Sequence, residues 1–492
     1  MQSETHAHYA LLNLGEDDRK RAVEYLIGRR TNPPQSAPVL AEVTDPAARL
    51  ELLAQLTATD QKDFARTGDR HNRTGLLWWY KPGATDYSSF LKRQMRTYVA
   101  GLNLQPALPD LGQLPARSWA FQFTFVLRKP YLSHNDADFY IIDNPLKKEW
   151  VFRIPYVAPS QWKGALRSAA IRRLVEQLQQ DGDEAAFAAR RLQLVRLYGN
   201  EKDGAERYLN AALARHRAGG LPADADQEAR NQWQVRLTAA AAAAAAEFER
   251  DLRRRGVQQG DVEGFSGSLT FYPTYFDAVA LEVINPHSRD SGGGKLPIYL
   301  EAVPAGTSGT FVLLNVPSDG DGDALDDLKA VAADVTTMLV EKGFGAKTSS
   351  GFGSAEDQLV GEGKLAIRAD LGGTSPAAGE AASSGPQPDA LTASIAQFLQ
   401  RFSVPEFPRW TDSELGASGW GGTRASAYKR LRDSHPDWDR QGRTWIEREA
   451  VTAEAPPAPA APPIGERAFA HLSDLPGVAR QVADELRQGG AQ

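Results

Sequence analysis

The sequence has no cysteine among its 492 residues and no long apolar run. Without cysteine, disulfides, cysteine nucleophiles, iron–sulfur clusters and thiolate zinc sites are all excluded. The longest uncharged apolar stretch, Ala239–Ala246, is far shorter than the ~20 residues that a membrane-spanning helix needs. The first ten residues contain no basic segment followed by an apolar one, so no secretory signal is expected. These absences predict a cytoplasmic protein that does not enter a membrane.

The chain also lacks a strong excess of either charge. Its 56 basic and 62 acidic residues give a formal net charge of −6. A nucleic-acid partner would therefore have to be held by a local basic patch, because the whole molecule is not a polycation. A hydrophobic content of 42% with 24% charged residues is typical of a folded globular chain. At roughly 100–200 residues per domain, the length predicts two to four domains.

Two segments of low complexity divide the C-terminal part of the chain. Residues 371–388 contain the run GGTSPAAGEAASSGPQP, and residues 453–465 are rich in alanine and proline. Neither can bury enough apolar surface to order itself, so both are predicted to be linkers. They separate a small helical segment, 389–452, from a C-terminal helix, 466–492. Residues 1–115 are predicted to form an N-terminal extension of short helices and loops.

The central block, 116–370, alternates strand and helix patterns. Aromatic and β-branched runs predict strands at 118–128, 150–157, 297–303, 309–316 and 362–370, with two more runs within 267–284. Helical patterns extend from Ser160 to about Leu178, through 184–256, and over 323–342. The order strand, helix, strands, helix, strand predicts an α+β fold with a ferredoxin-like, RRM-like βαββαβ core. Residues 184–256 are then a large helical insertion.

A glycine-rich loop, Gly343–Gly353, lies between the last predicted helix and the last strand. Its amides, hydroxyls and lysine are donors that suit phosphate. It is not a Walker loop, because Ala346 and Glu341 occupy the two glycine positions. It is not a dinucleotide loop either, because Thr348 stands at the third glycine of that pattern. From the residues alone, a hairpin that only satisfies turn geometry remains an alternative.

Two further segments carry donors that suit phosphate. Ser160 is a candidate N-cap of a helix start that bears four cations and no acid between 161 and 175, namely Lys163, Arg167, Arg172 and Arg173. The other segment, Asn285–Arg289, leaves a strand with His287 and Arg289. An ordinary solvated helix start and an exposed loop are the alternatives for these two segments.

Together and in this order, these three segments resemble the RAMP superfamily of type III CRISPR effector subunits. The helix signature of that family is matched by Pro159, Ser160, Lys163, Gly164 and Arg167. The sequence of the glycine loop, together with Asn-Pro-His after a strand, is most similar to that of the capping (sixth) RAMP subunit of the Cmr module. The resemblance covers about residues 116–370. The glycine that follows proline in the signature is missing here, because Ser160 directly follows Pro159.

The resemblance implies a structural subunit, the backbone or the cap, that binds guide RNA in antiviral defence. It implies as partners the guide and target RNAs, other RAMP backbone subunits, a small helical subunit and a large polymerase-like subunit. Base pairing would supply sequence specificity while the protein holds phosphates. The expected RNA-binding residues are Ser160, Lys163, Arg167, His287, Arg289, Gly345, Lys347, Thr348, Ser349, Ser350 and Gly351.

An acidic loop ahead of the helix leaves an alternative open. Asp143-Asn-Pro resembles a motif of the RAMP subunits that cleave target RNA, and Asp136 and Asp138 lie nearby in the sequence. Such a loop can hold Mg²⁺ and assist attack by a 2′-hydroxyl, as a metal-dependent endoribonuclease would. The alternative is a polar turn started by Asp143. No resident metal or other cofactor is expected, with Mg²⁺ required only if the loop cleaves.

A second alternative is a serine acyl-transfer enzyme. Ser160 and Lys163 fit an S-x-x-K pair, with Ser160 as nucleophile and Lys163 as base. Tyr198-Gly-Asn and Lys347-Thr-Ser approach the two other elements of such a site, but Ser349 replaces the required glycine. Matches of three residues are common in a chain of this length, so this alternative rests on little.

Overall fold

The computed structural model describes most of the chain. The described residues are 11–69, 74–81, 85–135, 139–199, 205–221, 224–254, 266–285, 297–317, 323–369, 429 and 464–489. The chain divides into two units, one formed by Met1–Gly372 with Pro463–Gln492 and the other by Gly373–Pro462. Apart from Lys429, all described residues belong to the first unit. The predicted linkers 371–388 and 453–465 and the segment 389–452 therefore lie outside the described residues, except for residues 429, 464 and 465.

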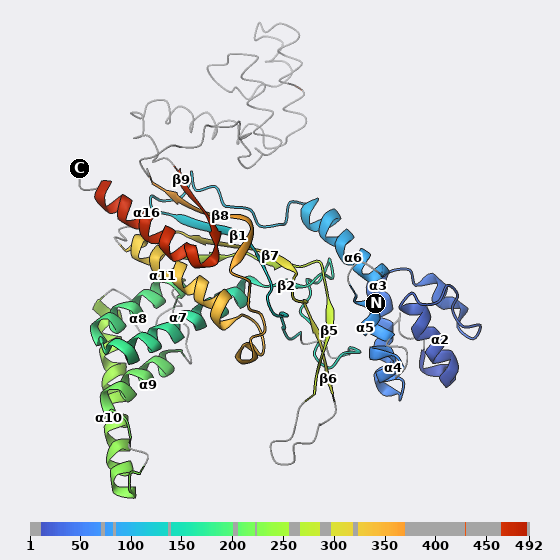
Figure 1. The fold of residues 1–492 in the computed structure, drawn as a ribbon, viewed down its shortest axis with the longest axis horizontal. Coiled ribbons are helices and arrows are strands. Elements are labelled where there is room, and N and C mark those ends of the chain that lie inside the picture. The colour runs from blue at the N-terminus through green and yellow to red at the C-terminus, as the bar shows by residue number, and fades with distance from the viewer. Residues whose placement is uncertain are drawn as a thin grey trace, which may run out of the picture. The chain divides into compact units, whose positions relative to one another are not determined.

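A five-stranded antiparallel sheet is the centre of the first unit (Figure 1). In spatial order its strands are β3 (Leu269–Phe271), β7 (Ser308–Asn315), β1 (Trp119–Val126), β8 (Gln358–Arg368) and β9 (Ile464–His471). The register is fixed by pairs such as Phe123 with Phe311 and Trp119 with Ile367. Apolar residues alternate along β1, and one-residue slippage would move all of them to the other face.

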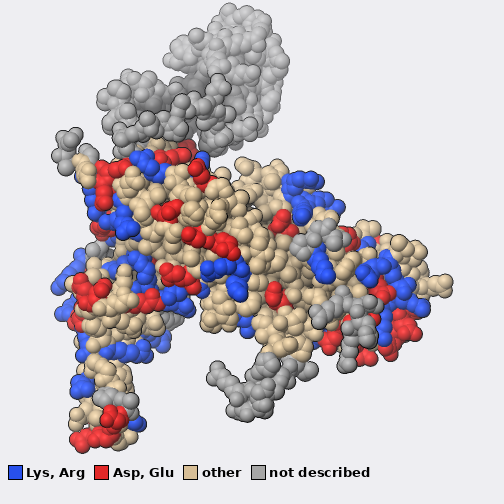
Figure 2. Space-filling view, in the orientation of Figure 1, with Lys and Arg blue, Asp and Glu red and all other residues tan. Residues whose placement is uncertain are grey.

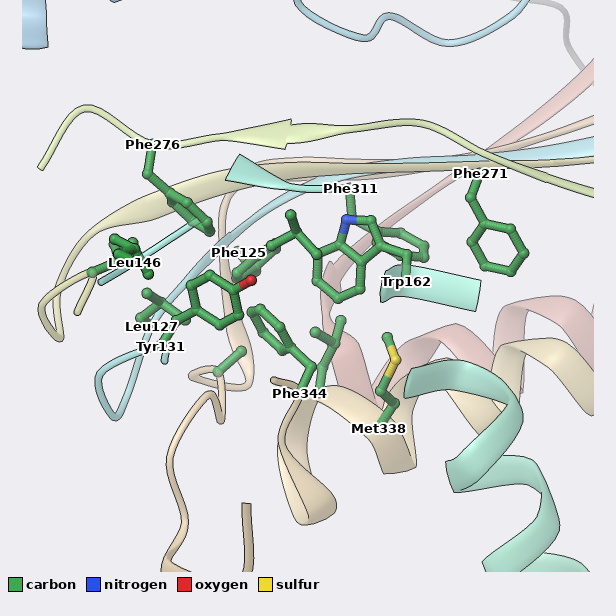
Figure 3. Packing of buried hydrophobic residues seen from close by; sticks show 14 of the residues in the cluster. Phe125, Leu127, Tyr131, Leu146, Trp162, Phe271, Phe276, Phe311, Met338 and Phe344 are labelled. Atoms are coloured by element: carbon green, nitrogen blue, oxygen red, sulfur yellow. The ribbon is translucent and has the colours of Figure 1, made fainter. Parts of the chain in front are cut away.

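Three helices cover one face of this sheet: α7 (Pro159–Asp181), α11 (Ala324–Thr336) and α16 (Leu475–Gly489). α11 continues directly into a π-helical turn, η5 (Thr337–Lys342). The core beneath them is aromatic: Trp162 of α7 lies 5.0 Å from Phe311 and 4.5 Å from Phe344, measured between ring centroids. Figure 3 shows these rings pointing towards one another between sheet and helices. Phe344 thereby fixes the start of the glycine-rich loop in the core.

The helical insertion forms α8 (Glu184–Tyr198), α9 (Ala205–Ala218) and α10 (Gln227–Arg254), as predicted for 184–256. It is fastened to α11 by buried ion pairs. Arg196 binds Asp327, with 2.5 Å between Nη2 and Oδ1, and Arg190 binds Asp334. Because both aspartates are buried, removing either arginine would take an ion-pair partner from a buried carboxylate, which is costly.

The N-terminal extension is helical, as predicted. Its elements are η1 (Leu11–Asn13), α2 (Glu16–Leu26), η2 (Pro38–Glu42), α3 (Pro46–Leu53), η3 (Ala54–Ala58), α4 (Lys62–Thr67), α5 (Gly75–Trp79), α6 (Asp86–Gln94) and the π-helical η4 (Met95–Ala100). The fully buried carboxylate of Glu301 joins the extension to the central block. It accepts hydrogen bonds from the hydroxyls of Tyr80 and Tyr140, the amide of Leu146 and the amine of Lys148.

The remaining short elements are β2 (Tyr156–Val157), β4 (Thr274–Tyr275), β5 (Ala280–Ile284), β6 (Ile298–Ala302), η6 (Thr348–Ser350) and η7 (Leu472–Asp474). β5 pairs with β6, and β2 with β4, each outside the main sheet. The region 267–284 was predicted to hold two strands and contains three. In the described part of the chain, no helix combines the length and the apolar composition needed to cross a membrane.

Two other predictions were wrong. Most of the predicted strand 150–157 is a turn, and only Tyr156–Val157 is a strand. Arg153 there takes a left-handed φ of 58°, which interrupts an extended backbone. The predicted helix 466–492 begins instead as strand β9, because residues 464–471 pair with β8, and the helix α16 begins only at Leu475.

Candidate nucleic-acid interface

A groove of about 500 Å³ lies between α7 and the glycine-rich loop. Three segments that are far apart in the sequence line it: the loop before the helix, one face of α7, and the loop after α11. The residues are Ser133, His134, Gln161, Gly164, Ala165, Ser168, Ala169, Arg172, Lys342, Gly343, Phe344, Gly345, Ala346 and Thr348. Two of the predicted motifs, the helix signature and the glycine loop, thus meet in one place.

Only one face of α7 lines the groove. Gly164, Ser168 and Arg172 recur every four residues along that face. At about 100° per residue, Lys163 is directed about 140° away from Ser168, and Arg167 is also on that other side. The signature residues Ser160, Lys163 and Arg167 are accordingly not among those that line the groove.

The start of α7 differs from the prediction at its cap. The N-cap is Ala158, and Pro159 takes the first helical position, where its missing N–H costs nothing. Ser160 is therefore inside the helix and does not cap it. Gln161 caps instead, since its side-chain oxygen accepts a 3.0 Å hydrogen bond from the amide of Ala158. The same oxygen is within reach of the Tyr131 hydroxyl at 3.5 Å, which holds Gln161 at the groove.

The four cations predicted on one helix face have different roles. Arg173 pairs with the buried Asp334 of α11 at 2.7 Å, so it fastens two helices. Burial raises the pKa of Asp334 in spite of its two arginine partners. Burial raises the pKa of the Tyr198 hydroxyl, and the nearby positive charge of Arg167 opposes that rise. Arg172 is exposed at the groove, and no acid of the described chain pairs with it.

The base of the glycine-rich loop is held rigidly. The amides of Ala346 and Gly353 donate to the carbonyls of Leu132 and Pro130, both at 2.8 Å. A Cβ on Gly345 would lie 2.3 Å from the carbonyl oxygen of Leu132, and both Gly345 and Gly353 have positive φ values. These glycines are thus needed for the packing of the loop itself, as the turn-geometry alternative had it.

The tip of the loop is different. Lys347 adopts a left-handed φ of 57°, and η6 follows with the exposed Ser349 and Ser350. Among the described residues, no acceptor takes the amides of Lys347, Thr348 or Ser349, while the amides of Ser350 and Gly351 turn back to Lys347 and Thr348. Successive unpaired amides beside an exposed lysine are the donor set that an anion binds.

Gly164 on the groove face is not explained by packing within the chain. It lies in the interior of α7, where glycine costs about 0.5–1 kcal/mol relative to alanine. A Cβ built on it would meet nothing within 4 Å. No neighbouring atom within the chain therefore requires glycine here. A glycine at such a position allows a ligand in the groove to approach the helix backbone closely.

Several residues of the groove were not predicted from the sequence: Ser133, His134, Gln161, Ser168, Arg172 as a groove residue, and Lys342. His134 is within 2.9 Å of the Asn144 side-chain oxygen, and Lys342 pairs with Glu176 at 2.7 Å. The spacing of Gln161, Gly164, Ser168 and Arg172 along the helix was a usable signal, because it marks one helix face. The predicted His287, Arg289, Asp136 and Asp138 lie outside the described residues.

Asp143 is held in ion pairs with the N-terminal extension. Its Oδ1 accepts from Nη2 of Arg66 at 2.6 Å and from Nζ of Lys62 at 3.2 Å. Burial alone would raise its pKa, but the hydrogen bonds and charges of Arg66 and Lys62 outweigh burial and lower it. Arg66 is buried and also donates to the carbonyl of Ile141 at 2.7 Å. In this geometry Asp143 ties the loop to helix α4.

No group of three or more histidine, aspartate or glutamate residues in the described ranges is arranged to hold a metal ion. The elements of the acyl-transfer alternative are also separated. Tyr198 is buried and stacks on Phe271. Thr348 lines the groove, whereas Ser160 and Lys163 are not part of its lining.

Comparison with protein families matches one part of the chain. Residues 138–356, somewhat less than half of the chain, match the model of the RAMP superfamily. The chain contains a RAMP superfamily domain. The match includes the face of α7 that lines the groove and the whole glycine-rich loop, whereas the groove residues Ser133 and His134 precede it. No curated protein matches the sequence.

Solved structures with similar folds include CRISPR components. A chain of the type III-B Cmr-beta complex bound to cognate target RNA is 12% identical, with coverage of 69% of this chain and 97% of that chain and a TM-score of 0.31. Cmr6 from Pyrococcus furiosus is 15% identical, with coverage of 49% and 99% and a TM-score of 0.24. A chain of a CRISPR RNA-guided surveillance complex, pre-nicking, is 12% identical, with coverage of 64% and 89% and a TM-score of 0.24.

Proposed function

We propose that this protein is a guide-RNA-binding subunit, backbone or cap, of a type III CRISPR ribonucleoprotein. The observation that carries the proposal is the groove, which Arg172 of α7 and Thr348 of the glycine loop both line, next to the unpaired amides at the tip of that loop. The partners would be guide and target RNA, other RAMP subunits, a small helical subunit and a large polymerase-like subunit. Its place would be the cytoplasm.

The fold supports this proposal through the order of its strands. β1, α7, β3, β7, α11 and β8 follow one another along the chain, and the strands lie side by side as β3-β7-β1-β8. We propose that this is a ferredoxin-like βαββαβ core, with α8–α10 inserted after its first helix and β9 added at its edge. In such a core the loop after the second helix stands beside the start of the first.

The chemistry of the groove suits a phosphodiester chain. The amides of Lys347, Thr348 and Ser349 can donate to one phosphate, and the exposed side chains of Lys347 and Arg172 can neutralise charge. None of these donors reads the edge of a base. Binding would therefore be uniform across sequences, with specificity supplied by guide pairing.

We propose binding and not cleavage as the task of this domain. Asp143 would have to leave Arg66 and Lys62 before it could take a metal, and Arg66 is buried with that carboxylate as its partner. A carboxylate that is already held in two ion pairs binds a metal less readily than a free carboxylate, because those pairs must first be given up.

The test is charge reversal at the groove. Arg172→Glu and Lys347→Glu should each weaken binding of a repeat-derived RNA, by a similar factor for every sequence tried. Each should also reduce the slope of log affinity against log salt by about 0.7, as expected for one lost contact to a single strand. Arg236→Glu on α10, another exposed cation outside the groove, is the matched control. A loss confined to particular sequences would contradict the proposal.

A second experiment examines the assembly itself. The protein is purified together with the products of neighbouring genes, and any RNA that accompanies it is sequenced. Short RNAs that share one repeat-derived end would support a guide-bound complex. A preparation free of nucleic acid, with no assembly when repeat RNA is added, would remove the proposal.

A further inference from the structure

A rigid turn on another part of the surface presents aromatic side chains to solvent. Residues 149–154 form this turn, and Trp150 and Val151 at its tip are 72% and 71% exposed. Tryptophan is highly buried on average, so an indole ring this exposed is unusual. Neither residue lines the groove between α7 and the glycine loop.

The turn is built to hold that shape. The Glu149 carboxylate accepts hydrogen bonds from the amides of Val151 and Phe152, both at 2.7 Å. The amide of Arg153 donates to the Glu149 carbonyl at 2.9 Å, while Arg153 stays in a left-handed conformation with φ 58°. A non-glycine residue kept in that region costs energy, so surrounding contacts must maintain it, and such sites are often functional.

Two flat stacks follow from this geometry. The guanidinium of Arg153 lies 4.7 Å from the ring centroid of Trp150, and its Nη2 is anchored 3.4 Å from Glu51. Phe152 stacks on Tyr98 of η4, with ring centroids 5.8 Å apart and planes 18° from parallel. We call Tyr98, Trp150, Phe152 and Arg153 the stacking platform. Arg153 covers one face of the Trp150 ring, and the opposite face of this exposed ring is available to a planar partner.

The charge beside the platform points to an anionic partner. Lys92, Arg93 and Arg96 are exposed on α6 and η4, and no acid of the described chain pairs with any of them. Residues 87–109 contain no aspartate or glutamate. Figure 2 shows the resulting group of basic side chains over α6. Two acids lie at the platform itself, Glu149 in the turn and Glu51 in α3. Each already has a partner within the protein, because Glu149 accepts from the amide of Val151 and Glu51 pairs with Arg153.

We propose that the stacking platform binds an unpaired nucleotide of a single-stranded RNA, with its base on Trp150 and its phosphates towards α6. Exposed aromatic rings beside a basic surface are the combination that binds single strands without reading sequence. The ligand class is the same as in the groove, and to that extent the proposal rests on the proposed function. The residues are different, however, and Tyr98 and α6 belong to the extension outside the RAMP match.

The experiment compares two probes on the full-length protein. One is an end-labelled oligouridylate of about 12 nucleotides, within the range that single-strand sites cover. The other is an abasic ribose-phosphate chain of equal length. Trp150→Ala should weaken oligouridylate binding by about 5- to 150-fold, the equivalent of one lost stacking contact, and leave abasic binding unchanged. Trp150→Phe should retain most of the affinity. Val235→Ala, at a 70% exposed site on α10, controls for loss of an exposed apolar side chain.

The results separate the two proposals. Arg172→Glu in the groove should weaken both probes, whereas Trp150→Ala should affect only the probe with bases. Unchanged oligouridylate binding by Trp150→Ala would overturn the platform proposal, as would an equal loss for both probes. Release of a protein subunit from the purified complex by Trp150→Ala, with RNA binding intact, would also overturn it and identify the turn as a protein contact.

Discussion

Gly164→Ala should change stability and RNA binding in opposite directions. The residue lies inside α7, with nothing within 4 Å of the position that a Cβ would take. Alanine should therefore relieve the cost of glycine in a helix and raise the free energy of unfolding by about 0.5–1 kcal/mol. If RNA occupies the groove, the same methyl group overfills the contact. Overfilling a packed contact costs about 1–3 kcal/mol, so affinity should fall by about 5- to 150-fold.

The assay measures both quantities on the same preparations. The urea midpoint reports stability, and the anisotropy of a labelled repeat-derived RNA reports affinity. Gly477→Ala is the matched control, because Gly477 is also an exposed helical glycine with nothing within 4 Å of its Cβ position, on α16 and away from the groove. It should gain stability and leave RNA binding unchanged. A stabilised Gly164→Ala protein with unaltered affinity would refute the placement of RNA against this face of α7.

Three further predictions concern residues that hold the N-terminal extension and the glycine loop in place. Asp143→Asn should lower stability by less than about 1 kcal/mol, because the carboxylate is partly exposed. The pKa of Asp143 in the folded protein lies below its ordinary value of 3.8. The stabilisation from Asp143 is therefore complete above pH 3.8 and is lost as the pH falls through the folded pKa. The urea midpoints of the wild type and the variant should accordingly converge in acid. Glu301→Gln should cost about 3–5 kcal/mol in the same assay, because it leaves the Lys148 amine without its buried partner. Gly353→Ala should abolish RNA binding while circular dichroism stays near that of the wild type, because its Cβ would lie 1.9 Å from a loop carbonyl.

The sequence predicts the elements that depend on local pattern. The aromatic alternation of β1 and the amphipathic α11, followed by Gly343, were confirmed because burial of one face is visible in the spacing. β9 was missed for the opposite reason. It has one large buried side chain, Phe469, and its partner β8 lies about a hundred residues earlier, so only the tertiary pairing makes it a strand.

The site was predicted in part. The sequence marks the glycine loop and the first helix as separate candidate segments, whereas their meeting at one groove and the lining of that groove are visible only in the structure. Lys163 and Arg167 were chosen by charge, and charge alone does not say on which side of a helix a residue lies. The turn at Trp150 was misread as a strand because apolar residues usually indicate burial. Here they are exposed, which makes the failed prediction itself a sign of function.

The antiparallel pairing of β8 with β9 brings together two segments that lie about a hundred residues apart in the sequence. Arg368 is the register partner of Ile464, so the chain leaves the sheet and returns to it at adjacent positions. Closing a flexible loop costs only about 0.6 kcal/mol for each doubling of its length. A flexible segment inserted between those two positions would therefore cost the sheet little, even if it were long. The edge of this sheet is thus a ready point of attachment, where evolution or an engineer can add a domain without redesigning the groove.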